Sequence, residues 1–155
     1  MRRERLLRKT AGFMLLCCGT LIAQEKGNWW PASTTAQSIT GAVTISEEKV
    51  SINFIGFPIA RIRALEAGEA SSAFDVDSGS PGTGSLYRLS IPASRRFLHK
   101  NTLCGSDETQ WMVTYVADKT LHLAFFSGAK PPVLTSEALA NSTEMCGTYS
   151  YSYGR

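Results

Sequence analysis

The chain has 155 residues, with 16 Lys and Arg against 13 Asp and Glu, and its formal net charge is +3. Residues 1–23 hold five of the basic and one of the acidic groups, so residues 24–155 keep 11 basic and 12 acidic groups, a net charge of −1. This balance excludes the global positive field expected of a protein that binds nucleic acid or an anionic membrane surface. The 132 residues after position 23 are an ordinary length for one domain.

The N-terminal segment has the order of features of a secretory signal peptide. Its first nine residues are cationic, an apolar run of 13 residues follows at positions 11–23, and Ala23 is a small residue at the cleavage position. A helix of 13 residues rises only about 20 Å, short of the ~30 Å hydrocarbon core of a bilayer. We therefore expect a signal peptide at residues 1–23 and a single exported β-domain at residues 24–155. The predicted location is the bacterial periplasm or the medium, with no transmembrane span after cleavage.

Cys17 and Cys18 lie inside this apolar run and raise lipidation as an alternative. A lipoprotein signal needs a small residue before the modified cysteine, whereas Leu16 precedes Cys17 and Cys17 precedes Cys18. Lipidation would also leave apolar residues 21–22 just outside the anchor. Cleavage after Ala23 is therefore favoured over a lipid anchor, and a retained, buried N-terminal helix is a further alternative.

Cys104 and Cys146 are the cysteines that remain after cleavage, and they predict one disulfide bond. An exported protein reaches a compartment that permits oxidation. The alternatives are two free thiols or half of a metal site. A metal site would need further soft ligands, and the sequence offers only His99 and His122. We expect a disulfide, no metal and no cofactor.

Alternating apolar and polar residues predict antiparallel strands through most of residues 39–153. In the first hairpin, residues 39–54, a loop at residues 46–49 would place these pairs on one buried face: Ile45 with Val50, Val43 with Ile52, and Gly41 with Phe54. Residues 59–65 and 86–91 predict further strands, separated by a mobile surface loop at residues 66–85. One of the paired tryptophans, Trp29 and Trp30, is expected to plug the end of a barrel or sandwich; a sugar-stacking or interfacial platform is the alternative.

The register of the central hairpin, residues 111–126, depends on the length of its turn. A two-residue turn at Asp118 and Lys119 makes both faces apolar, with Met112 opposite Phe125 on one face. A three-residue loop at residues 117–119 instead pairs Trp111 with Phe125 and leaves the second face partly polar. We expect the three-residue loop, because it is the register that yields one buried and one wet face.

The remaining segments complete the predicted fold. Residues 92–101 favour one helical turn, residues 136–140 are compatible with another, and residues 146–153 alternate as a last strand. The sequence therefore predicts an all-β domain. Its seven or eight antiparallel strands close as a small barrel or sandwich, with one short helical turn and one disulfide.

No catalytic motif is recognisable in the sequence. It contains neither a Gly-x-Ser-x-Gly elbow nor a His-Glu-x-x-His pair. We therefore expect a non-catalytic binding or inhibitor-type module for another envelope or extracellular protein. The candidate contacts are basic residues and the tyrosines of the last strand: Arg95, Arg96, Tyr149, Tyr151 and Tyr153. A solvated basic face and an inward-packed tyrosine strand are the plainer explanations of these residues.

Two other functions stay open at the level of sequence. A small-ligand carrier would keep an apolar cavity inside the barrel. A small periplasmic enzyme of unrecognised type would use His99 or His122 as a base.

Overall fold

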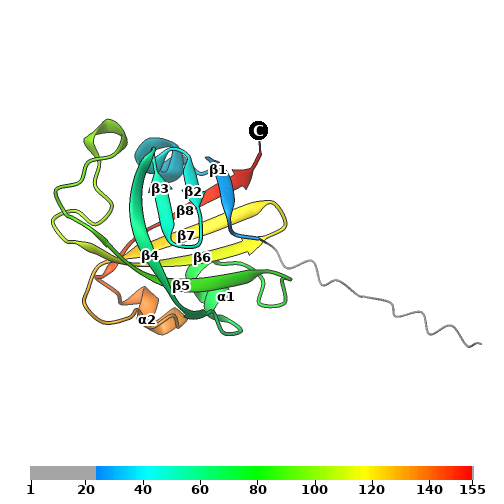
Figure 1. Cartoon of the computed structure of the whole chain (residues 1–155). Coiled ribbons are helices and arrows are strands. Elements are labelled where there is room, and N and C mark those ends of the chain that lie inside the picture. Colours follow the sequence, from blue (N-terminus) through cyan, green and yellow to red (C-terminus); the bar gives the residue numbers. More distant parts are fainter. Residues whose placement is uncertain (1–23, 155) are drawn as a thin grey trace, which may run out of the picture.

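The structure is a computed structural model that describes residues 24–154, so the predicted signal peptide and the lipid-anchor cysteines lie outside the described residues. Eight antiparallel strands pair in chain order, and β1 pairs with β8 to close a barrel (Figure 1). The strands are β1 (Gly27–Pro31), β2 (Val43–Ile45), β3 (Lys49–Ile52), β4 (Ile55–Ala64), β5 (Thr83–Ile91), β6 (Thr109–Ala117), β7 (Thr120–Phe126) and β8 (Met145–Tyr153). The prediction of an all-β domain is confirmed, and the closed architecture is a barrel of eight strands.

Four short helical segments lie in the connections: η1 (Ala36–Thr40), α1 (Glu69–Phe74), η2 (Leu98–Lys100) and α2 (Ser136–Ala140). The expected turn at residues 136–140 is confirmed as α2. The turn expected over residues 92–101 is reduced to the 3-10 segment η2, whose His99 has non-helical dihedral angles. The expectation of a mobile surface loop throughout residues 66–85 is wrong, because α1 forms within this segment and buries Ala73.

The barrel interior is filled by apolar and aromatic side chains from every strand. The largest of them are almost fully buried: Trp29, Met112, Leu121, Phe125 and Tyr151. The indole nitrogen of Trp29 donates a hydrogen bond to the carbonyl oxygen of Glu25 at 2.8 Å. Trp29 thus plugs the barrel as predicted, while Trp30 is partly exposed on the outside.

The central hairpin adopts the register that the sequence disfavoured. β6 and β7 pair Trp111 with Phe126 and Met112 with Phe125, and Asp118 and Lys119 form a two-residue turn. Both faces are apolar because both are buried. One faces the barrel interior, and the other lies beneath α1 and α2.

The outer face of β5, β6 and β7 therefore carries a second core outside the barrel. It comprises Leu86, Trp111, Val113, Ala124, Phe126 and Leu134, with Phe74 of α1 and Leu139 of α2 packed against it. Figure 1 shows both helices side by side on this flank of the barrel. Arg63 of β4 anchors α1 through two hydrogen bonds to the Glu69 carboxylate, at 2.6 and 2.9 Å. The hydrogen bonds from Arg63 are the main reason that the pKa of Glu69 is lowered.

The β2–β3 hairpin has the predicted register, with Val43 opposite Ile52 and Ile45 opposite Val50. The predicted inward pair of Gly41 and Phe54 is wrong. Ile52 pairs with Ile55, so Asn53 and Phe54 form a two-residue turn, and Phe54 projects into solvent. The strand that follows also starts earlier than expected. Phe57 and Ile59 are its buried residues, and Ile62, which lies at the register shift between Arg61 and Arg63, is 51% exposed.

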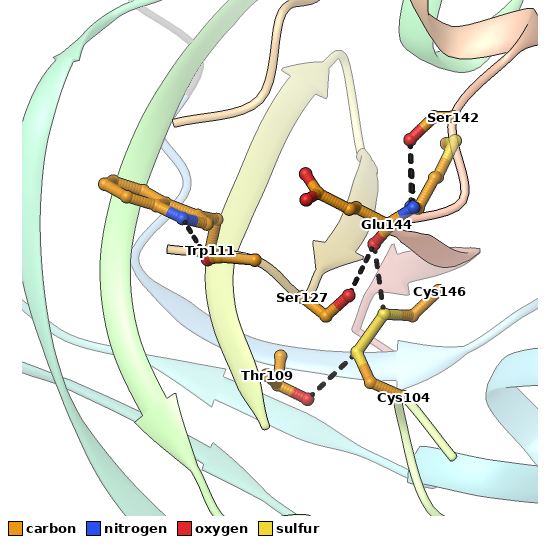
Figure 2. Close-up of a disulfide and its surroundings, with 9 residues drawn as sticks. Cys104, Thr109, Trp111, Ser127, Ser142, Glu144 and Cys146 are labelled. Atoms are coloured by element: carbon orange, nitrogen blue, oxygen red, sulfur yellow. Dashed lines mark hydrogen bonds between the residues drawn. A yellow bond between two sulfur atoms is a disulfide. The ribbon is translucent and has the colours of Figure 1, made fainter. Parts of the chain in front are cut away.

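The sulfur atoms of Cys104 and Cys146 are bonded, and the bridge joins residues 42 positions apart (Figure 2). Cys104 lies in the connection before β6, and Cys146 lies at the start of β8. The hydroxyl group of Thr109 donates a hydrogen bond to the Cys104 sulfur at 3.2 Å. The two cysteines pack against the barrel core, and the Trp111 indole nearby donates to the Gly128 carbonyl at 3.0 Å.

Candidate interaction surface

One end of the barrel is formed by three segments that meet, and we call them together the tip surface. They are the turn at Asn53 and Phe54, η1 with the adjoining Gly41, and residues 92–101. A Cβ atom built on Gly41 would lie 3.2 Å from Leu98 Cδ1 and 3.7 Å from Asn53 Oδ1, so all three segments meet there. Figure 1 shows η1 and the connection after β5 at the end opposite the β6–β7 turn.

Phe54 is the most prominent side chain of the tip surface. It is 96% exposed, more than any other large hydrophobic side chain among residues 24–154. Its backbone is left-handed, with φ of 68°, next to Asn53 with φ of 47°. Asn adopts this conformation readily, whereas a bulky residue does so at a cost, and Gly normally fills the second position of such a turn. The left-handed conformation of Phe54 therefore lowers the stability of the fold, and the exposed side chain makes no core contact that would offset this cost.

A second left-handed pair lies beside the first. His99 and Lys100 have φ of 54° and 62°. Two hydrogen bonds hold this pair on η1, because the carbonyl oxygen of Ser38 lies 3.0 Å from Nδ1 of His99 and accepts from Nδ2 of Asn101 at 3.2 Å. The tip surface thus contains two strained turns, and the second is fixed to η1 by these hydrogen bonds.

η1 itself is tied to the barrel interior. The hydroxyl groups of Thr40 and Tyr151, both fully buried, share a hydrogen bond of 2.7 Å. The Thr40 hydroxyl also donates to the carbonyl oxygen of Ala36 at 3.2 Å. The tip surface therefore rests on the core, and its turns are held in place before any contact is made.

Arg95 and Arg96, predicted as contacts, lie on the tip surface and are exposed, as is Lys100. The guanidinium carbon of Arg95 lies 6.0 Å above the ring of Phe57, and the ring of Phe97 packs edge-on against the same ring at 6.1 Å between centroids. The two salt bridges among the described residues, Lys26 with Glu47 and Arg63 with Glu69, involve none of these three cations.

The three predicted tyrosines do not form one exposed stripe. Tyr149 and Tyr151 are 2% and 0% exposed, project into the barrel, and cannot touch a partner in this structure. Burial raises the pKa of Tyr149 to about 12 and that of Tyr151 still further. Tyr153 is 55% exposed and packs edge-on against Trp29, with ring centroids 5.3 Å apart.

Tyr153 also lines an aromatic groove on the outside of β1 and β2. Trp30, Phe54 and Tyr153 border this groove, whose volume is about 540 Å³, and Ala42 and Thr44 form part of its lining. Phe54 belongs to both features, so the groove continues the tip surface down the side of the barrel.

The opposite end of the barrel holds a polar cluster. The carboxylate of Glu25 accepts hydrogen bonds from the hydroxyl groups of Tyr87 and Thr114, and Arg61 donates to the hydroxyl of Ser85 at 3.0 Å. Burial, and then the Glu25 carboxylate, raise the pKa of Tyr87. This cluster adjoins an open pocket of about 560 Å³, lined mainly by residues 24–26, β4 and β5.

The two histidines lie in different parts of the fold and have different chemical surroundings. His99 belongs to the tip surface, whereas His122 lies on the outer face of β7, where Phe74 and Tyr115 stack on it at 5.5 and 6.2 Å. Nδ1 of His122 hydrogen-bonds the Ser150 hydroxyl at 3.1 Å, and burial lowers the pKa of His122. Neither histidine has a carboxylate partner among the hydrogen bonds of residues 24–154, so neither has the orienting group usual for a catalytic base.

Among residues 24–154, no group of three or more His, Cys, Asp and Glu side chains is arranged to hold a metal ion. None of the helices in this range has the length and apolar character to cross a bilayer.

Sequence reasoning missed Phe54, the most exposed residue of the candidate surface. The strand alternation alone assigned it inward, because its parity matches that of Val50 and Ile52. The available signal was Asn53, a residue that favours left-handed turns and here ends the strand two residues early.

Comparison with protein-family models, with curated proteins and with solved structures found no match for this chain.

Proposed function

We propose that this protein is a non-catalytic binding module that docks onto another protein through the tip surface, with Phe54 as the anchor. The observation that carries the proposal is Phe54, which is 96% exposed in a left-handed backbone conformation. Strained backbone and exposed aromatic rings both concentrate at binding sites. The signal peptide expected at residues 1–23 supports a partner in the envelope or outside the cell.

The construction of the tip surface supports a rigid mode of binding. Ser38 and Thr40 fasten η1 to residues 92–101 and to the barrel core. A loop already held in its binding conformation loses little entropy when it docks. A rigid turn with an aromatic side chain at its apex is suited to a concave site on a partner, which includes the inhibitor-type role expected from the sequence.

The alternative of a small-ligand carrier finds less support. Buried side chains such as Trp29, Phe125 and Tyr151 occupy the middle of the barrel where its ligand would lie. The open pocket beside Glu25 is polar at its edge, unlike the apolar interior that a carrier requires.

The test is site-specific photo-crosslinking in the cells that produce the protein. A benzophenone amino acid replaces Phe54 in one variant and Val133 in the control variant. Val133 suits the control because it is 64% exposed and lies in the connection after β7, away from the tip surface. The proposal expects one discrete cross-linked protein from position 54 and none from position 133.

Affinity then decides whether the cross-link reports a real interface. With the identified protein purified, Phe54→Ala should weaken binding by about 30-fold or more, as loss of an aromatic anchor does. Its circular dichroism should be unchanged, because Phe54 is 96% exposed. Equal cross-linking from both positions, absence of any cross-link, or unchanged affinity of Phe54→Ala would each overturn the proposal.

A further inference from the structure

We infer that the site receiving Phe54 is an apolar pocket bordered by carboxylates, so that the tip surface binds an acidic face of a folded protein. This inference rests on the proposed function and adds the chemistry of the partner. It is carried by the distribution of charge over the tip surface and along the barrel.

The tip surface carries positive charge alone. Residues 92–101 contain Arg95, Arg96 and Lys100 and no Asp or Glu, and η1, Gly41 and the turn at Asn53 and Phe54 contain no charged side chain. The carboxylates that follow residues 92–101 in the chain, Asp107 and Glu108, lie beyond Cys104, and Glu108 accepts a hydrogen bond from Ser90. The tip surface thus carries, with Phe54, three exposed cations that have no ion pair among the described residues.

The carboxylates gather at the opposite end of the barrel. Of the 12 Asp and Glu after residue 23, eight lie in the connections there: Glu25, Glu47, Glu48, Glu66, Glu69, Asp75, Asp77 and Asp118. Four cations lie with them: Lys26 and Lys119 in the connections, and Arg61 and Arg63 near the end of β4, where Arg63 pairs with Glu69. A protein of nearly neutral net charge therefore has an asymmetric charge along its axis, which turns the tip surface toward an acidic partner during approach.

The cations lie on the segment that packs at the foot of the Phe54 turn, where they would border a pocket that Phe54 enters. Leu98, between Arg96 and Lys100 in the chain, lies beside Gly41 at the foot of the Phe54 turn. Arg95 is held over Phe57 of β4, the strand that begins directly after Phe54. Guanidinium groups pair with carboxylates through two parallel hydrogen bonds, which gives such a rim orientation as well as attraction.

A bilayer with anionic lipids is the other surface that attracts an aromatic residue with cations around it. Binding to a bilayer grows with the apolar area inserted, and of the described residues Phe54 is the one large hydrophobic side chain exposed on the tip surface. One ring at the apex of a narrow turn offers little area to a bilayer but fills a protein pocket. The observations therefore favour a protein.

The test compares two charge-reversal variants with the partner identified by cross-linking at position 54. Arg96→Glu with Lys100→Glu changes the tip surface, and Lys119→Glu with Lys130→Glu is the matched control with the same change in net charge. All four side chains are exposed. The first variant should bind about tenfold more weakly or worse, and the control should bind within about twofold of the unmodified protein.

Two further measurements complete the test, namely the salt dependence of binding and the binding to lipid vesicles. Raising salt from about 50 to about 500 mM should weaken binding of the unmodified protein several-fold and affect the Arg96→Glu and Lys100→Glu variant less. Equal affinities of the two charge variants, or no salt dependence, would overturn the inference while loss of binding in Phe54→Ala still upholds the proposed function. Phe54-dependent binding to vesicles of phosphatidylglycerol and phosphatidylethanolamine would overturn both.

Discussion

Single residues in this protein depart from the conformations that sequence patterns favour, and the departures cluster. Four of the six non-glycine residues with positive φ among residues 24–154 lie in the tip surface: Asn53, Phe54, His99 and Lys100. Each left-handed residue other than Gly or Asn costs about 1 kcal/mol or more. Their concentration at one end of the barrel is the physical basis for regarding that end as functional.

At the residue scale, the burial of His122 predicts that the stability of the fold decreases at acidic pH. Burial between Phe74 and Tyr115 lowers its pKa below the ordinary value of 6.5, so the unfolded chain binds this proton more readily than the folded one. The contribution of the neutral His122 side chain to the free energy of unfolding is therefore intact above pH 6.5, and it is lost as pH falls below that value. Between about pH 7.5 and about pH 5.5, Tm should fall for the unmodified protein and fall less for His122→Gln. Parallel pH profiles of the two proteins would show that His122 is not responsible.

At the scale of elements, the β6–β7 hairpin is organised by two cores. Its inner face packs in the barrel, and its outer face packs under α1 and α2, with Leu134 buried in the second core. A strand that is covered on both sides has no polar face. This double covering explains why the register with two apolar faces is adopted.

The outer core should contribute a measurable part of the stability. Leu134→Ala removes a side chain buried against Trp111 and Phe126, and should lower the free energy of unfolding by about 3 kcal/mol in urea denaturation. Val133→Ala is the neighbouring control, because Val133 is 64% exposed and its truncation should change stability by less than about 0.5 kcal/mol. Similar effects of both substitutions would mean that α2 and its connection do not pack as a core.

The elements predicted from sequence are those whose pattern is local. The β2–β3 register, the strand character of β5 to β8 and the turn at α2 follow from alternation and turn residues a few positions apart. The β6–β7 register was predicted wrongly, because the choice depends on α1 and α2, which come from distant parts of the chain. The tip surface was predicted only in part. Arg95 and Arg96 are recognisable as basic, but their proximity to Phe54 depends on the packing of residues 92–101 against η1.

At the scale of the whole molecule, the closure of the barrel and the disulfide both join parts of the chain that are distant in sequence. Cys104 and Cys146 join the segment before β6 to the start of β8 across 42 positions (Figure 2). In the chain-entropy description, a bridge of this span destabilises the unfolded state by about 4 kcal/mol. That amount is comparable with much of the total stability of a small domain.

Replacing both cysteines by serine should therefore lower the free energy of unfolding by about 4 kcal/mol in urea denaturation. The unmodified protein with added reductant should approach the stability of the double variant. A loss below about 1 kcal/mol would show that the unfolded chain is already compact around these positions.

The central claim is that the protein retains Phe54 for binding and at the expense of stability, and one measurement tests it without a partner. Phe54→Gly relieves the left-handed strain and forms the Asn-Gly turn that two-residue hairpins prefer. The free energy of unfolding from urea denaturation should rise by about 1 kcal/mol, whereas Asn53→Gly, as the control, should change it little. A loss of about 1 kcal/mol or more in Phe54→Gly would contradict the claim, because Phe54 would then contribute to the fold.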